Sequence, residues 1–344
     1  MKRLALLAHD KFPDHDQAKT ALGLIRYGNY DVRAVIDRSN AGRRVPDVLP
    51  DGPDAPIVAR MEEVEDEIDA LALGVANVGG RLDEDWRPDI CEALRRGCTV
   101  MAGLHDFLQE DEEFAALAEA HDATIWDVRK PPADLPVSRG VADEVEATVV
   151  LAVGTDCAVG KKTAALELTE AARKRGHDAA FVPTGQTGIM IAGWGLPVDA
   201  VPSDFTAGAV EQMILEKGDA HDWLFVEGQG TIVHPGYSGV ACGILHGAMP
   251  DALVLCHTAG RTHIHGFDAF ALPPLRDYVH LHEDLARPVK PTRVAAGALN
   301  TRALDDDAAA RAAVEQYKSA IGLPAADPVR FGTDPILDAL TNAD

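Results

Sequence analysis

The sequence predicts an α/β protein with two domains, each built on a parallel β-sheet. Short apolar runs alternate with helical patterns in both halves of the chain, which is typical of parallel strands joined by helices. The 344 residues are enough for about two domains of ~150 residues each. A proline-containing segment without periodicity, residues 127–147, separates the two halves and suits a linker. We therefore expect domains at residues 1–135 and 136–344.

The first half contains five apolar runs that predict strands, at residues 4–8, 33–37, 71–76, 98–103 and 123–126. Helical patterns lie near residues 18–27, 86–96 and 111–120. No Gly-x-Gly-x-x-Gly run follows the first strand, so a dinucleotide-binding turn is not expected. Gly79-Gly80 follows a strand and could line a ligand crevice, although a plain turn explains it more simply.

The second half continues the alternation of strands and helices. Strands are predicted at residues 147–154, 178–184, 222–228 and 251–257. Helices are predicted at residues 164–176 and 310–322. We find no internal repeat in either half.

The composition is strongly acidic. Asp and Glu total 55 against 32 Lys and Arg, which gives a net charge of −23; Asp supplies 36 of the acids and Lys only 10 of the bases. Such a composition, spread along the whole chain, is typical of proteins from a salt-rich cytoplasm. It argues against nucleic acid and anionic membranes as partners. In molar salt the Debye length is about 3 Å, so nearby cations and backbone N–H groups would decide the binding of an anionic ligand.

The sequence shows no sign of export. No apolar run approaches the ~20 residues needed to cross a bilayer, and the first strand meets Asp10 too soon for a secretory signal. We therefore expect a cytoplasmic protein. The cysteines form no Cys-x-x-Cys pair, so neither a disulfide framework nor a zinc ribbon is expected. Their positions are Cys91, Cys98, Cys157, Cys242 and Cys256.

The strongest motif lies where a buried strand turns into a helix. Its members are Gly154, Thr155, Asp156, Cys157, Ala158, Val159, Gly160, Lys161, Lys162 and Thr163. The glycines let backbone N–H groups converge on an anion, and the positive end of the following helix points at the same place. Lys161 adds a full charge. The sequence therefore predicts a phosphate-binding loop.

This loop departs from the usual Gly-x-x-x-x-Gly-Lys-Ser/Thr pattern in two ways. Five residues separate its glycines instead of four, and in this it resembles the loop of dethiobiotin synthetase and its relatives. Lys162 also stands where a hydroxyl would hold Mg²⁺, and a second cation disfavours a metal there. Thr163 could supply a hydroxyl if the helix register slipped. We interpret the loop as a phosphate cradle that works without metal-assisted phosphoryl transfer.

Two candidate catalytic residues follow a neighbouring strand. Glu227 ends the strand predicted at 222–228, and ligands bind at the carboxyl ends of parallel strands. His234 follows closely in a loop, where a histidine can take a proton at neutral pH. The structural alternatives are a carboxylate that caps a turn and a histidine held by hydrogen bonds.

Four further residues are candidates for substrate binding. Thr184 and Gln186 follow a predicted strand and could contact polar groups of a ligand, although loop chemistry also explains them. Asp204 precedes a helical pattern and could instead be an N-cap. Arg261 could bind a carboxylate through two of its planar donors. No carboxylate or cysteine stands at metal-like spacing from the histidines near Arg261, so no metal site is predicted.

At this point several motifs resemble one two-domain family, long described as a domain of unknown function. Its characterised members are D-glutamate N-acetyltransferases from marine proteobacteria and halophilic archaea. The likeness covers nearly the whole chain, and its second-half motifs are the more specific ones. The motifs read GTDCAVGKKTAALEL, TGQTG, VEGQGTIVHPGYSGV and HTAGR, behind AVIDRSNAG and LALGVANVGG in the first half.

The resemblance implies a Rossmann-like N-terminal domain, a P-loop NTPase-like C-terminal domain, acetyl-CoA as donor and D-glutamate as acceptor. The loop would then bind phosphates of coenzyme A, and Glu227 or His234 would take a proton from the acceptor amine. The turn at residues 228–230 would supply N–H donors to the tetrahedral intermediate, and Arg261 would bind an acceptor carboxylate.

Two other functions stay open. One is an ATP-dependent carboxylate-activating ligase resembling dethiobiotin synthetase, which would use Mg-ATP. The other is a non-catalytic nucleotide-binding protein. In each case the partner is a small molecule, and a chain of this size and class is expected to form a homo-oligomer.

Overall fold

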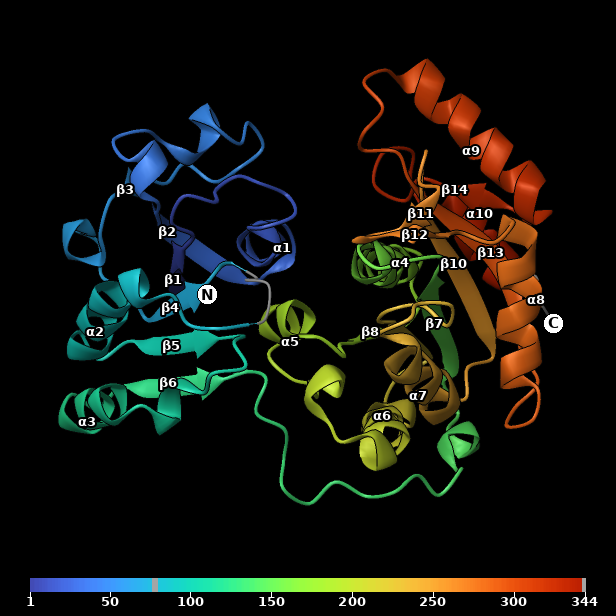
Figure 1. The fold of residues 1–344 in the computed structure, drawn as a ribbon, viewed down its shortest axis with the longest axis horizontal. Coiled ribbons are helices and arrows are strands. Elements are labelled where there is room, and N and C mark those ends of the chain that lie inside the picture. Colours follow the sequence, from blue (N-terminus) through green and yellow to red (C-terminus); the bar gives the residue numbers. More distant parts are fainter. Residues whose placement is uncertain (76–79, 342–344) are drawn as a thin grey trace. The chain divides into compact units, whose positions relative to one another are not determined.

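The computed structural model describes residues 1–75 and 80–341, and these fall into two compact units (Figure 1). The first unit contains Met1–Pro131 together with Gln186–Pro197, and the second contains Pro132–Gly185 and the chain from Val198 onward. Each unit holds a six-stranded sheet whose neighbouring strands all run parallel. The predicted α/β class is therefore confirmed.

The first unit has its strands in the order β3-β2-β1-β4-β5-β6, so the order reverses between β1 and β4. The strands are β1 (Lys2–Leu7), β2 (Tyr30–Ile36), β3 (Ile57–Val58), β4 (Ala70–Leu73), β5 (Thr99–Ala102) and β6 (Thr124–Asp127). The helices are α1 (Lys19–Tyr27), α2 (Arg87–Arg95), α3 (Glu112–Ala120) and α5 (Gln186–Ala192). Part of the strand predicted at 71–76, and Gly79 of the predicted crevice, lie outside the described residues.

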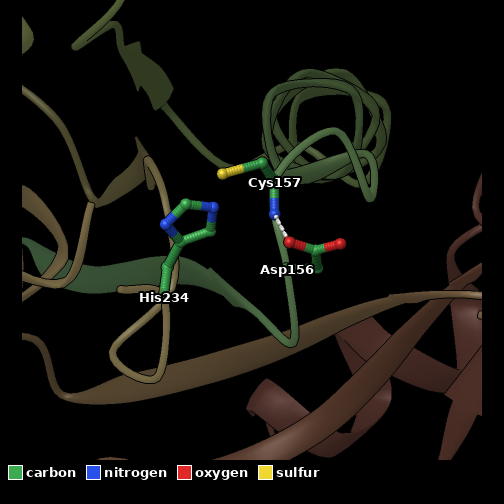
Figure 2. Close-up of side chains that lie close together, drawn as sticks. All are labelled: Asp156, Cys157 and His234. Carbon is green, nitrogen blue, oxygen red and sulfur yellow. Dashed lines mark hydrogen bonds between the residues drawn. The ribbon is translucent and has the colours of Figure 1, made fainter. Parts of the chain in front are cut away.

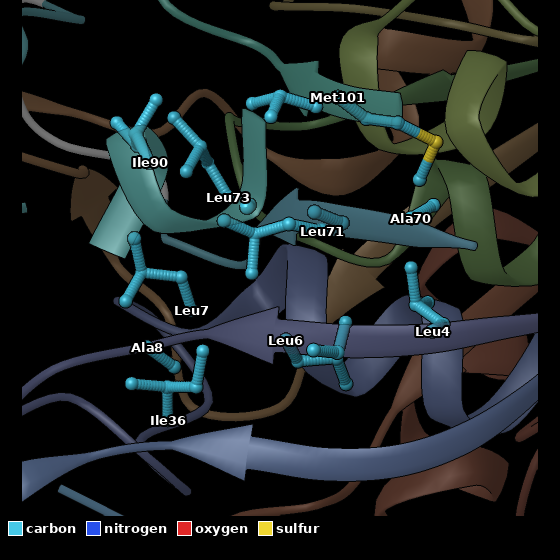
Figure 3. Packing of buried hydrophobic residues seen from close by; sticks show 14 of the residues in the cluster. Leu4, Leu6, Leu7, Ala8, Ile36, Ala70, Leu71, Leu73, Ile90 and Met101 are labelled. Carbon is cyan, nitrogen blue, oxygen red and sulfur yellow. The ribbon is translucent and has the colours of Figure 1, made fainter. Parts of the chain in front are cut away.

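The core of the first unit forms around β1, which is buried on both faces. Leu4 and Leu6 are fully buried, and Figure 3 shows them among side chains of the neighbouring strands, while Ile90 of α2 lies near Leu73 of β4. Burying one such leucine stabilises the fold by about 1.5–3 kcal/mol. A central parallel strand covered on both faces explains why this segment reads as a continuous apolar run.

Helix α5 returns to the first unit although it follows a strand of the second. The Thr187 and Thr20 hydroxyl oxygens lie 2.8 Å apart, and the Tyr30 hydroxyl donates to the Met190 carbonyl at 2.8 Å. Ile189 and Met190 are buried in the same core as β1. The sequence patterns did not indicate this return.

The second unit has its strands in the order β14-β13-β10-β7-β9-β8, with a separate hairpin of β11 and β12. The strands are β7 (Thr148–Gly154), β8 (Ala179–Val182), β9 (Trp223–Glu227), β10 (Ala252–Thr258), β11 (His263–Ile264), β12 (Phe267–Ala271), β13 (Arg293–Asn300) and β14 (Ala325–Ala326). The helices are α4 (Lys161–Lys174), α6 (Ser203–Gly218), α7 (Ser238–Ala248), α8 (Leu275–Ala286), α9 (Asp307–Ile321) and α10 (Asp334–Thr341).

Strand β7 lies between β10 and β9, so the loop that follows it leaves from the middle of the sheet's carboxyl edge. A buried carboxylate anchors the segment that leads into this strand. Glu211 of α6 accepts the N–H groups of Arg139 and Val141, both at 2.8 Å.

The five cysteines, all within the described residues, are free thiols. Among the described helices, none is long and apolar enough to cross a membrane.

Candidate functional site

The loop between β7 and α4 forms a turn whose backbone opens toward the start of the helix. Ala158 and Gly160 have φ values of 55° and 102°, a left-handed conformation that bends the chain sharply. Helix α4 begins at Lys161, and its N-cap residue is Gly160, which has no side chain that could bond the first N–H groups. N–H groups at the start of a helix form an anion site, and phosphate binding here stays a prediction.

Lys161 is buried within this turn, where it is 7% exposed. Its Nζ atom donates to the Asp156 carbonyl at 2.7 Å. A Cβ atom on Gly154 would lie 3.0 Å from Nζ, and one on Gly228 would lie 2.0 Å from the Ala152 carbonyl oxygen. Both glycines are thus needed for the chain to pack this closely. Burial lowers the pKa of Lys161, since a carbonyl partner does not neutralise its charge.

Asp156 holds the loop in place. Its fully buried carboxylate accepts Arg261 Nη1 at 2.7 Å, the His265 N–H at 2.8 Å and the Cys157 N–H at 2.6 Å. The same Arg261 atom reaches the Cys157 carbonyl at 3.2 Å. Arg261, which the sequence suggested for a substrate carboxylate, is therefore paired with a carboxylate of the protein itself. Its role toward a substrate stays a prediction.

His257 fixes the other side of the loop. Its Nδ1 atom lies 2.8 Å from the Thr155 hydroxyl, and its ring stacks on Tyr317 with the centroids 5.6 Å apart. Burial, with a smaller effect of Arg261, lowers the pKa of His257 to about 4, so the ring is neutral at neutral pH. Sequence reasoning did not single out His257. Its place at the end of β10, next to β7, was the signal that could have found it.

Glu227 lies beside the loop because β9 pairs with β7, with Glu227 opposite Ala152. Its Oε2 atom accepts the N–H groups of Thr184 at 3.1 Å and Gly185 at 3.2 Å. The Thr184 hydroxyl donates to the Glu227 carbonyl at 2.7 Å. Burial raises the pKa of Glu227, opposed by the charge of Lys162 and by the two N–H groups. A carboxylate with a raised pKa is a suitable general base.

His234 is 2% exposed and lies close to the loop. Its Nδ1 atom accepts the N–H groups of Gly236 at 3.0 Å and Tyr237 at 3.2 Å, which leaves the ring proton on Nε2. Burial lowers the pKa of His234. The neutral ring is therefore arranged to donate a hydrogen bond through Nε2 rather than to accept a proton there.

Asp156, Cys157 and His234 come together at this point, with possible ligand atoms within 4.8 Å of one another. In Figure 2 the Cys157 sulfur points toward the His234 ring. The donor set suits a divalent ion poorly, because Asp156 is paired with Arg261 and Nε2 of His234 carries the ring proton. The buried ammonium of Lys161 lies in the same loop.

The remaining predicted residues lie in different surroundings. Thr184 is buried and bonded to Glu227, whereas Gln186 begins α5 and belongs to the first unit. With its amide oriented to suit both partners, Gln186 donates to the Gly103 carbonyl at 2.7 Å and accepts from Arg129 at 3.3 Å. Asp204 is exposed in the first turn of α6, whose N-cap is Pro202 and not Asp204.

Comparison with known families matches both parts of the chain. Residues 136–337 match the P-loop domain described as DUF1611_C, a domain of unknown function. Residues 38–131 match the Rossmann-like domain described as DUF1611_N. The predicted Rossmann-like and P-loop assignments of the two domains are therefore confirmed.

Individual relatives match most of the chain. A D-glutamate N-acetyltransferase from Tritonibacter scottomollicae is 40% identical over 271 residues, which cover 78% of this chain and 80% of the relative. One from Pseudoalteromonas sp. is 36% identical over 268 residues, with the same coverage of 78% and 80%. The crystal structure of a DUF1611 family protein from Anabaena variabilis has a TM-score of 0.94 at 39% identity, covering 99% of this chain and 100% of that one.

Proposed function

The chain belongs to the two-domain DUF1611 family, which includes D-glutamate N-acetyltransferases, and we propose that it transfers an acetyl group from acetyl-CoA to the amino group of D-glutamate. The observation that carries the proposal for this chain is the buried ammonium of Lys161 in a phosphate loop with a lysine, Lys162, where a metal-binding hydroxyl would stand. Such a loop suits a phosphorylated carrier from which no phosphoryl group is transferred.

The donor binds through its pyrophosphate. The N–H groups at the start of α4 and the Lys161 ammonium bind the phosphate oxygens, and Lys161 exchanges its bond to the Asp156 carbonyl for a charged partner. The pair of Asp156 and Arg261 keeps the loop in shape while this happens. Glu227 lies at the carboxyl end of β9, the strand next to β7, so the thioester end of a donor bound at the loop would meet it at this edge of the sheet.

The acceptor amine must lose a proton to become a nucleophile. Glu227 takes that proton, the amine nitrogen attacks the thioester carbonyl carbon, and the carbon–sulfur bond breaks. Glu227 then gives its proton to the departing thiolate, which leaves as coenzyme A, and the second proton of the attacking nitrogen passes to solvent. The Nε2 proton of His234 and the N–H groups of residues 228–230 stabilise the negative oxygen of the tetrahedral intermediate. Base catalysis of this kind typically contributes about 10²- to 10⁴-fold to the rate.

The test is an assay of the purified chain in molar KCl with acetyl-CoA and single amino acids, following free thiol. We expect release with D-glutamate and much less with L-glutamate or D-aspartate. A parallel assay with Mg-ATP follows ADP; its release with a small carboxylic acid would favour the ligase instead. Tight nucleotide binding without turnover of either donor would indicate a non-catalytic protein.

Two finer expectations concern the conditions in which the enzyme works. The net charge of −23 supports activity in concentrated salt, because self-repulsion between acidic side chains extends over ~10 Å at 0.1 M salt but only ~3 Å at 1 M. We expect the rate to fall when KCl is lowered from about 1 M to about 0.1 M. The proposed homo-oligomer is tested by sedimentation in the same two buffers.

A further inference from the structure

Three exposed aromatic rings gather on one side of the phosphate loop. Tyr237, Phe267 and Phe270, here called the aromatic wall, are 54%, 41% and 49% exposed. The ring centroids of Phe267 and Phe270 lie 6.2 Å apart at 76°. Large exposed apolar side chains that cluster, unlike those that occur singly, mark a binding surface.

The aromatic wall is tied directly to the loop. The buried ring of His234 stacks on Tyr237 at 4.5 Å and meets Phe267 edge-on at 5.1 Å. The same His234 has a ring nitrogen within 4.8 Å of a carboxylate oxygen of Asp156. Asp156 also accepts the His265 N–H at 2.8 Å, which fixes the β11–β12 hairpin against the loop. One histidine ring thus separates the aromatic wall from the residues that would hold phosphate.

From this arrangement we infer that the aromatic wall binds the adenine ring of the acetyl donor, next to the pyrophosphate in the loop. The inference rests on the proposed function and adds the subsite that recognises the nucleotide end of acetyl-CoA. Aromatic faces bind bases by stacking, which needs no particular hydrogen-bond pattern. A ribose is the linker that joins a base at the wall to a phosphate at the loop.

The loop and the aromatic wall differ in chemistry. The loop offers a helix N-terminus and the ammonium of Lys161, which suit the pyrophosphate. The wall offers uncharged aromatic faces, which suit the base. The pyrophosphate and the base are therefore directed to different places.

The experiment compares two donors that share a thioester but differ in the nucleotide. In Phe270→Ala, we expect KM for acetyl-CoA to rise by about 5- to 100-fold, the range measured for lost base stacking. KM for S-acetylpantetheine, which has no adenine, should stay at the wild-type value. Phe270→Trp keeps a stacking surface and should keep KM for acetyl-CoA near wild type. Leu281→Ala is the control, because it removes an apolar side chain of 41% exposure from α8.

Three results would overturn the inference. The first is an equal rise of KM for both donors in Phe270→Ala, and the second is no rise for either. The third is dissociation of an oligomer in Phe270→Ala with both donors affected, which would make the wall an interface between copies of this chain. If the wild-type chain releases no thiol from any donor, the proposed function fails. Ligand binding measured by calorimetry then tests the adenine subsite separately. Weaker binding of acetyl-CoA or ATP, but not of S-acetylpantetheine, to Phe270→Ala would still support an adenine subsite; unchanged binding would refute it.

Discussion

The two six-stranded parallel sheets differ at the carboxyl ends of their strands, and also in strand order: β1 pairs with the next strand, β2, whereas β7 pairs with β9 and not with β8. In the first unit, acidic side chains there are bonded to their own chain: Asp37 accepts the Asp10 N–H at 2.6 Å and the Asn40 amide at 2.7 Å. Asp89 belongs to α2 and lies 2.8 Å from His9, which follows β1; it also accepts the Met61 N–H at 2.6 Å. These carboxylates organise loops of the protein. In the second unit, the carboxyl ends of the strands lie beside a buried ammonium, that of Lys161.

This difference teaches that a strand end becomes a candidate site through its charges and not through its position alone. Lys161 donates to a carbonyl, and the carboxylate of its loop, Asp156, is paired with Arg261. The positive charge of Lys161 is therefore left for an anionic ligand. Asp127, at the end of β6 in the first unit, shows the opposite case, since two N–H groups at 2.9 and 3.0 Å bond its buried carboxylate.

The largest effect should come from replacing Lys161 by a neutral side chain of similar length. In Lys161→Met we expect kcat/KM for acetyl-CoA to fall by about 100-fold or more, because a preorganised cation is lost from the phosphate site. The free energy of unfolding should stay the same or rise, since a buried charge is removed. Lys174→Met, at the exposed end of the same helix, should change neither quantity. Unchanged acetyl-CoA binding in Lys161→Met would contradict the loop assignment.

An effect of similar size should come from the loss of the proposed base. Glu227→Gln should lower kcat by about 100-fold or more. The glutamine carbonyl can still accept the Thr184 and Gly185 N–H groups, so the fold should persist. In the wild type, burial raises the pKa of Glu227, so the rate should increase with pH through that raised value as the carboxylate forms. The variant should lose this limb of the pH–rate profile.

Glu211→Gln is a matched control for Glu227→Gln. Glu211 is also buried and also accepts backbone N–H groups, but it serves the segment at residues 138–141. This variant should unfold at lower denaturant concentration and keep the pH profile of the wild type. A Glu227→Gln enzyme that retained the pH-dependent limb would rule out Glu227 as the base.

Much of this fold could be predicted from the sequence, and the exceptions have physical reasons. The central strands are buried on both faces and read as apolar runs, so β1 and β7 were found. Strand β13 was missed because its small residues make room for α9: a Cβ atom on Gly297 would lie 2.5 Å from Tyr317. The return of α5 to the first unit depends on tertiary contacts, such as that of Thr187 with Thr20, for which one sequence carries no signal.

The candidate site was predictable in part for similar reasons. Loop chemistry and strand ends are local, so the phosphate loop and Glu227 could be named in advance. The pairing of Asp156 with Arg261 joins residues 105 positions apart, and nothing in the sequence indicates that these two side chains meet. Hence Arg261 was assigned to a substrate, whereas the structure gives it a partner within the loop.

Arg261 provides the third prediction. Arg261→Met leaves the fully buried carboxylate of Asp156 without a cation, and we expect the free energy of unfolding to fall by about 3 kcal/mol. This is the lower end for a broken buried pair, because the arginine side chain is 21% exposed. Arg261→Lys keeps the charge and should recover part of the loss in a denaturant titration. Unchanged stability with a raised KM for D-glutamate would instead assign Arg261 to the acceptor carboxylate.

The smallest effect should come from the first unit. The comparison predicts that a substitution there changes the free energy of unfolding but not the kinetics of acetyl transfer. Asp89→Asn keeps the shape and the bond from the Met61 N–H, but its amide nitrogen meets the Nε2 proton of His9. One buried hydrogen bond is lost, so the free energy of unfolding should fall by about 1 kcal/mol. KM for acetyl-CoA and for D-glutamate should not change, because these side chains bond to their own chain. A change in either KM at unaltered stability would mean that the first sheet's edge also binds a ligand, and the contrast between the two edges would no longer hold.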